Sequence, residues 1–204
     1  MLTLHRAALL LATVLTPSGA APLITDGAVL VDGAVVVAVG PFAPVEGARV
    51  REWDGLLTPG LLNPYGRWLL ETAYHPDPRE ELGDEPLLPD FEVDAQRRGG
   101  SARRGLQRML GYGTTAVAGP FSLPVVRTAV ARSGLVALPG EGAAGGLDPL
   151  ASAGPAAAVH RPLTVGGRAD FAVFDVSSVE ELADAGAGSC VATVLGGRLV
   201  YRRR

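Results

Sequence analysis

The sequence predicts a mixed α/β protein in which both chain ends form one β-sandwich, with a small set of strand–helix units between them. Two observations predict this class: β-branched runs broken by turn dipeptides fill both ends, and strands alternate with helices in the middle. A chain of 204 residues with 48% hydrophobic content is long and apolar enough to bury a core.

The N-terminal part reads as a set of strands. Residues 2–15 form an apolar run, and residues 28–31 and 34–39 are β-branched runs separated by the dipeptide DG at 32–33. Such a dipeptide favours a tight hairpin, because the turn needs positive φ angles. The stretch ARVREWDG predicts another strand, which we expect to end at its own DG dipeptide.

The C-terminal part mirrors this pattern. Residues 169–176 predict one strand, and SCVATVLGGRLVYRRR predicts two more around a turn at Gly196 and Gly197. Each set of strands is small for an independent domain. Packed together, they would make one sandwich from residues 1–58 and 160–204.

The middle of the chain changes to strand–helix alternation. We expect a helix from Ser101, as N-cap, to Leu110, then a strand in TTAVAG, a helix in LPVVRTAVARSG and a strand in LVALPG. A β-α-β order implies parallel pairing. We assign these units to residues 59–139, and interpret the Gly-, Ala- and Pro-rich residues 140–159 as a linker.

Composition excludes several classes of function. All 18 basic residues are arginine, so no lysine can serve as a Schiff base or bind phosphate. A net charge of −3 provides no cationic face for nucleic acid. The single cysteine, Cys190, lies in a strand-like run and is interpreted as a buried hydrophobic residue.

The N-terminus allows two interpretations. Residues 1–21 have a short charged start, an apolar run and small residues near Ala20 and Ala21, as a secretory signal peptide would. The apolar run is too short to span a bilayer, so no membrane association is expected. We favour a first strand leading into a turn at 17–19, which predicts a cytoplasmic protein; cleavage would instead predict a secreted one.

Three segments of the chain resemble the amidohydrolase superfamily, and most closely the composite domain of the bacterial imidazolonepropionase and aminodeoxyfutalosine deaminase group. They occur in the order of the family and cover about half of the chain: DGAVLVDGAVVVAVGP, LLTPGLLNP, and TVGGRADFAVFDV with VATVLGGRLVYR. The resemblance implies a composite β-sandwich joined to a (β/α) barrel that holds a catalytic metal ion. The middle of the chain would then be a remnant of that barrel.

The family motif PGLxNxHxH, whose two histidines bind metal, is altered here. Tyr65 and Arg67 stand at the two histidine positions. Arginine is permanently charged and has no lone pair to offer, and a neutral tyrosine is a poor ligand. The segment from residue 60 to 155 is also less than half of the roughly 200–250 residues of a complete barrel. We therefore expect a truncated barrel, no catalytic residues and no cofactor.

Other candidate sites have simpler interpretations. His75 and Asp77 could begin a relocated zinc site, but they open an acidic, proline-broken stretch that we interpret as a solvated loop. GEGAAG at 140–145 matches a nucleotide-binding pattern, yet Pro149 and Pro155 interrupt the helix that this motif requires. His5 and His160 are expected to be surface or hairpin residues.

The sequence thus predicts an amidohydrolase-like pseudoenzyme that acts by binding a ligand, for which Tyr65 and Arg67 are the candidate contacts, or a partner. The alternative is a metal-dependent hydrolase or deaminase of non-peptide carbon–nitrogen bonds, with a site that is relocated or shared between subunits. A shortened parallel sheet should leave an open edge and an uncovered apolar face. We therefore expect a homo-oligomer, or a complex with a related full-length hydrolase.

Overall fold

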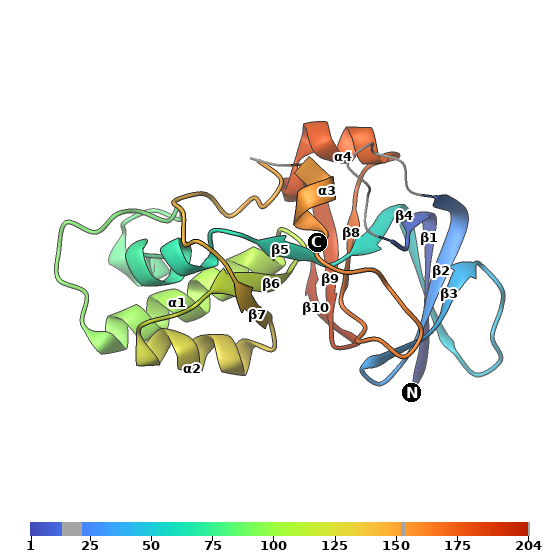
Figure 1. Ribbon diagram of the computed structural model, residues 1–204, viewed down its shortest axis with the longest axis horizontal. Helices are drawn as coiled ribbons and strands as arrows, with labels where there is room; N and C mark the ends of the chain where they lie inside the picture. The colour runs from blue at the N-terminus through green and yellow to red at the C-terminus, as the bar shows by residue number, and fades with distance from the viewer. Residues whose placement is uncertain (14–21, 152–153, 204) are drawn as a thin grey trace.

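The computed structural model describes residues 1–13, 22–151 and 154–203. The strand expected at 2–15 runs over Leu2–Leu11 (β1). The turn expected at 17–19 and the small residues at 20–21 lie outside the described residues. The fold has two parts, a seven-stranded sheet built from both chain ends and a three-stranded parallel sheet carrying two helices (Figure 1).

The large sheet combines both ends of the chain, as expected. Its strand order is β10-β9-β8-β4-β1-β2-β3. The two expected hairpins are present, with turns at 33–34 and 196–197. The strands are β2 (Leu23–Asp32), β3 (Val35–Pro41), β4 (Arg49–Pro59), β8 (Phe171–Phe174), β9 (Cys190–Leu195) and β10 (Arg198–Arg202).

Strand β4 joins the two halves of this sheet. It pairs in parallel with β1 and antiparallel with β8, with Leu56 opposite Phe174. We expected it to end at the dipeptide DG, but it continues to Pro59. Gly55 allows this because a Cβ atom there would collide with the carbonyl oxygen of Phe174. The glycine therefore permits close strand pairing at this position and does not end the strand.

The large sheet curls so that one face encloses a core. Beyond its strand pairing, β3 is bonded to the segment before β8: the Val36 amide donates to the Gly167 carbonyl at 2.9 Å, and the Ala169 amide to the Ala34 carbonyl at 2.8 Å. The enclosed side chains come from β1, β2, β3, β4, β8 and β9. The expected sandwich is thus one continuous sheet folded over its own core.

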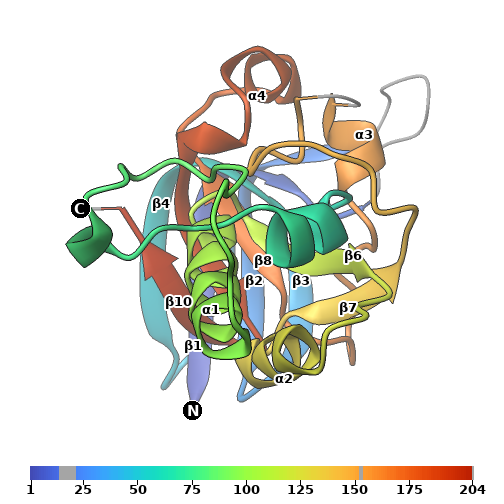
Figure 2. The same ribbon diagram turned by 90° about the vertical axis from the view of Figure 1, so that its left-hand side faces the viewer.

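The middle of the chain forms the expected β-α-β units. Strands β5 (Leu61–Asn63), β6 (Thr114–Gly119) and β7 (Val136–Pro139) are parallel in the order β5-β6-β7. Helices α1 (Ala95–Leu110) and α2 (Pro124–Ser133) lie side by side against this sheet (Figure 2). The barrel is therefore reduced to three strands.

Helix α1 begins earlier than the sequence indicated. Its N-cap is Asp94, whose carboxylate accepts the Arg97 amide at 2.8 Å, and Ser101 lies buried inside the helix. Charged residues at 97 and 98 hid the first turns from a pattern based on hydrophobic spacing, although a capping aspartate is a standard start signal. The helix ends before Gly111, as expected.

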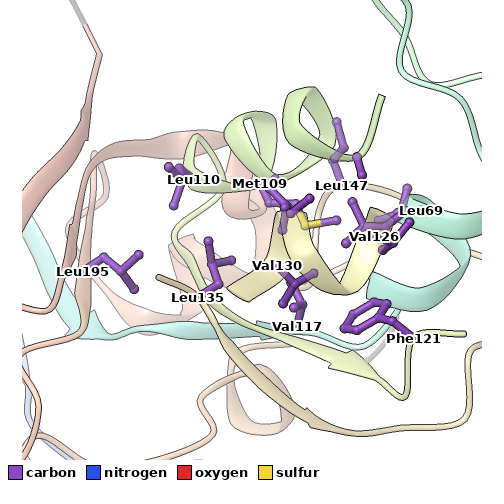
Figure 3. Close-up of a cluster of buried hydrophobic side chains, with 14 residues drawn as sticks. Leu69, Met109, Leu110, Val117, Phe121, Val126, Val130, Leu135, Leu147 and Leu195 are labelled. Atoms are coloured by element: carbon purple, nitrogen blue, oxygen red, sulfur yellow. The ribbon is translucent and has the colours of Figure 1, made fainter. Parts of the chain in front are cut away.

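One apolar cluster holds the helices on the small sheet and the small sheet on the large one. It gathers side chains of α1, α2 and β6 and also Leu195 of β9 (Figure 3). A contiguous cluster of this kind marks a shared core. The remaining short elements are η1, a π-helical turn (Trp68–Thr72), η2 (Pro78–Glu80), α3 (Gly154–Ala158), α4 (Val179–Ala185) and η3 (Ala187–Ser189).

The expected linker is packed against the small sheet. Residues 140–147, here called the crossing segment, run past the carboxyl ends of the three parallel strands. A Cβ atom at Gly140 would touch Ala118 of β6, and one at Gly145 would overlap the Tyr65 ring after β5. Further along, Val159 forms a β-bridge with Leu61, and α3 is helical. The Gly-, Ala- and Pro-rich segment interpreted as a linker therefore packs against the small sheet and includes α3, and its assignment, like the domain boundaries, stays a prediction.

Both faces of the central strand are covered as well. All six residues of β6 are buried. The expectation of an uncovered apolar face is therefore wrong for this strand, since helices and the returning chain cover it. The outer strand β7 pairs only with β6 among the described residues, and its residues Ala137 and Pro139 are exposed. An open edge remains, as expected.

Replacing Gly145 should test whether the crossing segment packs as described. A Cβ atom at this position would lie within 2.5 Å of three ring atoms of Tyr65, so we expect Gly145→Ala to lower the free energy of unfolding by about 1–3 kcal/mol. Gly146→Ala is the matched control, because its Cβ would meet only one atom, at 4.0 Å. Urea unfolding of both variants measures the difference; equal stabilities would contradict close packing.

Candidate functional site

The turn that follows β5 is held by a buried asparagine. The Asn63 side chain accepts the Tyr65 amide at 2.9 Å and donates to the carbonyls of Gly146 and Leu147, at 3.3 and 3.0 Å. One amide group thereby satisfies three backbone groups. It fixes the turn carrying Tyr65 and Arg67, and it ties that turn to the crossing segment.

Tyr65 is packed between the helices and the crossing segment. Its ring is half-buried against the apolar cluster of α1 and α2, and it lies where a side chain at Gly145 would be. The ring therefore fills space at the strand ends. In a (β/α) barrel this is the end that carries catalytic residues.

Arg67 is engaged by residues of its own chain. Its Nε lies 3.5 Å from Oε2 of Glu71, and its Nη2 donates to the Ser122 hydroxyl at 3.4 Å. The Glu71 side chain is only 9% exposed, and its other oxygen accepts the Leu123 amide at 2.6 Å. Glu71 thus links the turn to the start of α2. Arg67 is therefore paired with a nearby acidic residue, Glu71, and this ion pair is a structural contact within the chain.

His75 lies in the core and not on a solvated loop. Its side chain has no exposed surface, and Nε2 is 3.0 Å from the carbonyl oxygen of Leu69. The ring packs where a side chain at Gly105 of α1 would be. The pKa of His75 is lowered to about 4, first by burial and then by nearby arginines, Arg108 first among them, while the hydrogen bond with the Leu69 carbonyl opposes the shift.

Asp77 has different partners from His75. Its carboxylate accepts the Arg79 amide at 3.1 Å, which caps η2, and it pairs with Arg104 at 3.2 Å. The side chains of the two candidate ligands therefore bind different partners. Nowhere in the described ranges do three His, Cys, Asp or Glu side chains gather so that they could hold a metal ion.

The first part of the acidic stretch is bound to α1. Arg98 donates to the carbonyl of Ala73 at 2.6 Å, and Arg104 donates to the carbonyl of His75 at 2.9 Å. The amide of His75 in turn donates to Ser101 at 2.8 Å. The interpretation of this stretch as a solvated loop is therefore wrong at its start, where His75 and Pro76 are buried.

Glu80 is the centre of this arrangement. It accepts hydrogen bonds from the Asp77 amide at 2.8 Å, from the Tyr74 hydroxyl at 2.7 and 2.8 Å, and from Arg97 at 2.9 Å. The bond from the Asp77 amide, followed by that from Tyr74, lowers the pKa of Glu80 to about 2. Hydrogen bonding to the charged form explains the direction.

The other two histidines are also withdrawn from solvent, although His5 lies in a strand pair and was expected at the surface or in a hairpin. His5 is buried, stacked on Trp53 and edge-on to Phe171, and burial lowers its pKa to about 4. His160 is half-buried, with Nε2 3.5 Å from the Thr115 hydroxyl. Cys190 is buried, as expected. His5 lies in β1 and His160 directly follows the bridge residue Val159, and both contact residues distant in sequence, so local pattern could not show their burial.

Sequence reasoning missed the roles of Asn63 and Glu71. Asn63 stands within the motif LLNP, and Glu71 follows Arg67 by four residues, a spacing typical of an ion pair on one helical face. The spacing could have identified the pair. The bonds of Asn63 to residues 146 and 147 could not be found in this way, because they join segments more than eighty residues apart.

The architecture now has both parts that the sequence resemblance implies. A composite sheet from both chain ends is joined to parallel strand–helix units, and strand β4 of the large sheet leads directly into β5, the first parallel strand. The fold is amidohydrolase-like. It contains three barrel strands, and its strand ends are covered by the crossing segment.

Comparison with known proteins gave matches among solved structures alone, since no family model and no curated protein matches the chain. Similar structures include ochratoxinase from A. niger (17% identity, TM-score 0.43), an adenosine deaminase from Xanthomonas campestris with bound zinc (25%, 0.44) and guanine deaminase from Bradyrhizobium japonicum (17%, 0.48). They cover 67–68% of this chain. The chain spans only 30–34% of their length.

The described part of the chain has no helix that is both long and apolar enough to cross a bilayer.

His75 should make stability depend on pH. Its pKa is about 4 in the folded protein and near 6.5 when unfolded, so between these values the unfolded chain binds more protons and stability falls as pH falls. We expect a loss of about 1 kcal/mol per pH unit from this residue. The substitution His75→Gln should remove this contribution to the pH dependence of stability, and a similar contribution from His5 should remain. Urea unfolding of the wild type and of His75→Gln at pH 6.5 and 4.5 measures the difference; an unchanged slope in His75→Gln would count against burial.

Glu80 should make the stability of the fold depend on pH in a more acidic range than His75 does. Its folded pKa of about 2 lies below the ordinary 4.5, so its stabilisation is complete above 4.5 and is lost as pH falls towards 2. We expect Glu80→Gln to melt at a lower temperature than the wild type at pH 7, and the gap to shrink between pH 4.5 and 2.5. Glu81→Gln, at the exposed neighbouring position, is the control. A gap that does not depend on pH would show that the charge is unimportant.

Proposed function

We propose that this protein is a non-catalytic member of the amidohydrolase-like fold that acts by binding another protein. The observation that carries the proposal is the turn after β5. Where the family motif has two metal-binding histidines, this chain has Tyr65 packed against Gly145 and Arg67 paired with Glu71. A guanidinium group has no lone pair to donate, so Arg67 cannot replace a histidine ligand.

Hydrolysis by this type of enzyme needs a metal held by about three protein ligands, with an open position for water. The crossing segment lies over the strand ends where such a site would open. His75 and Asp77, the remaining candidate ligands, are committed to the Leu69 carbonyl and to Arg104. The residues present therefore do not fit a catalytic metal, and we derive no catalytic step.

A small anionic ligand at Arg67 fits less well than a protein partner. Glu71 already places a carboxylate 3.5 Å from the guanidinium, and this carboxylate is fixed by the Leu123 amide. An incoming carboxylate or phosphate would have to compete with it. We therefore assign the binding role to an exposed protein surface.

We also propose that the protein stays in the cytoplasm. Strand β1 lies between β4 and β2 inside the large sheet, and it contributes Leu4, Leu10 and Leu11 to the core. Cleavage of residues 1–21 as a signal peptide would remove this inner strand. Mass spectrometry of the protein from its native source, by the mass of the N-terminal peptide, distinguishes the two cases.

Metal analysis tests the absence of a catalytic ion. We expect protein purified without chelators, then incubated with zinc and desalted, to hold well below one equivalent per chain. The variants His75→Gln and Asp77→Asn should not change that value. About one equivalent in the wild type, lost in either variant, would overturn the proposal in favour of a metal-dependent hydrolase or deaminase with a relocated site.

A further inference from the structure

Opposite charges are segregated between two segments of this chain. Residues 80–94, here called the acidic loop, contain no basic residue and seven acidic ones: Glu80, Glu81, Asp84, Glu85, Asp90, Glu92 and Asp94. Residues 119–139, which form α2 and β7 with their flanking turns, contain two arginines and no carboxylate. The two segments are therefore complementary in charge.

The acidic loop also presents apolar side chains to solvent. Leu82 is 42% exposed and Leu88 is 65% exposed, although both are large hydrophobic residues. The loop is ordered around Leu88, because Leu87 exchanges two backbone hydrogen bonds with Tyr74, at 2.8 and 2.9 Å. Leu88 is thus held outward on a fixed backbone, which lowers the entropy that binding would cost.

An apolar groove lies on the other charged segment. It has a volume of about 680 Å³ between α2 and the open-edge strand β7, and its lining includes Phe121, Val130, Ala131, Leu135 and Leu138. Arg127 is the one charged residue that lines it. In Figure 2, strand β7 lies at the outer side of the small sheet, next to α2. An apolar groove beside an unpaired strand edge is suited to a protein segment.

We propose that the acidic loop of a second copy of this chain docks in this groove, with Leu88 as the apolar anchor. Charge complementarity selects the occupant: the loop brings carboxylates and leucine to a surface that offers arginine and apolar side chains and contains no acid. The contact joins two different surfaces, so it is head-to-tail. The inference rests on the binding role proposed above but not on the lack of catalysis, so metal analysis and association measurements can fail separately.

Light scattering after size-exclusion chromatography tests the proposal. We expect the mass of the wild type to rise above that of a monomer with concentration, and to rise less at high salt, which screens the charges. Leu88→Ser should raise the dissociation constant at least about tenfold, the effect of losing one buried leucine. Leu23→Ser is its control, because Leu23 is 39% exposed on β2 of the large sheet.

A charge placed in the groove should have the same effect as the loop variant. Ala131→Glu adds a carboxylate at an exposed groove position of α2 and should prevent association by repelling the acidic loop. Thr128→Glu adds the same charge on the same helix outside the groove and should leave association unchanged. Circular dichroism confirms that the variants are folded.

Mixing the two defective variants gives the decisive measurement. Leu88→Ser retains an intact groove and Ala131→Glu retains an intact loop, so the mixture should associate although each variant alone does not. Recovery in the mixture identifies a loop-to-groove contact. A wild type that stays monomeric at every concentration, variants that associate as the wild type does, or a mixture that stays monomeric would each overturn the proposal.

Discussion

The close contact between the turn after β5 and the crossing segment determines how much open space remains at the carboxyl ends of the parallel strands. Asn63 binds the carbonyls of residues 146 and 147, and Tyr65 fills the space that a side chain at Gly145 would need. Parallel strands need cover on both faces. Helices α1 and α2 cover one face of the small sheet, and the crossing segment lies over the carboxyl ends of its strands, the end at which a complete barrel carries catalytic residues.

Arginine has two separate uses in the part of the molecule built around α1. Arg97 and Arg104 pair with carboxylates, whereas Arg98 and Arg104 also donate to backbone carbonyls of the segment 73–80. A planar fork of five donors can serve both kinds of acceptor, which an ammonium group does less well. The exclusive use of arginine in this chain therefore suits a fold that must hold an irregular, proline-broken segment against a helix.

The two buried histidines take part in packing within the core. His5 is held between aromatic rings and His75 under α1, and burial lowers the pKa of each to about 4. A neutral imidazole fits these positions at neutral pH. Protonation would place an uncompensated charge in an apolar environment, and near His75 it would add to the charges of three arginines.

The sequence alone determined the hairpins, the joining of both chain ends in one sheet, the β-α-β order and the presence of Tyr65 and Arg67 after the first parallel strand. These features depend on turn dipeptides, hydrophobic period and residue chemistry, which are local. Tertiary structure alone decided that β4 runs past Gly55, that residues 140–147 pack as cover, and that His5 and His75 are buried. Each of these depends on contacts between segments distant along the chain, and such contacts override local composition because burial outweighs intrinsic preference.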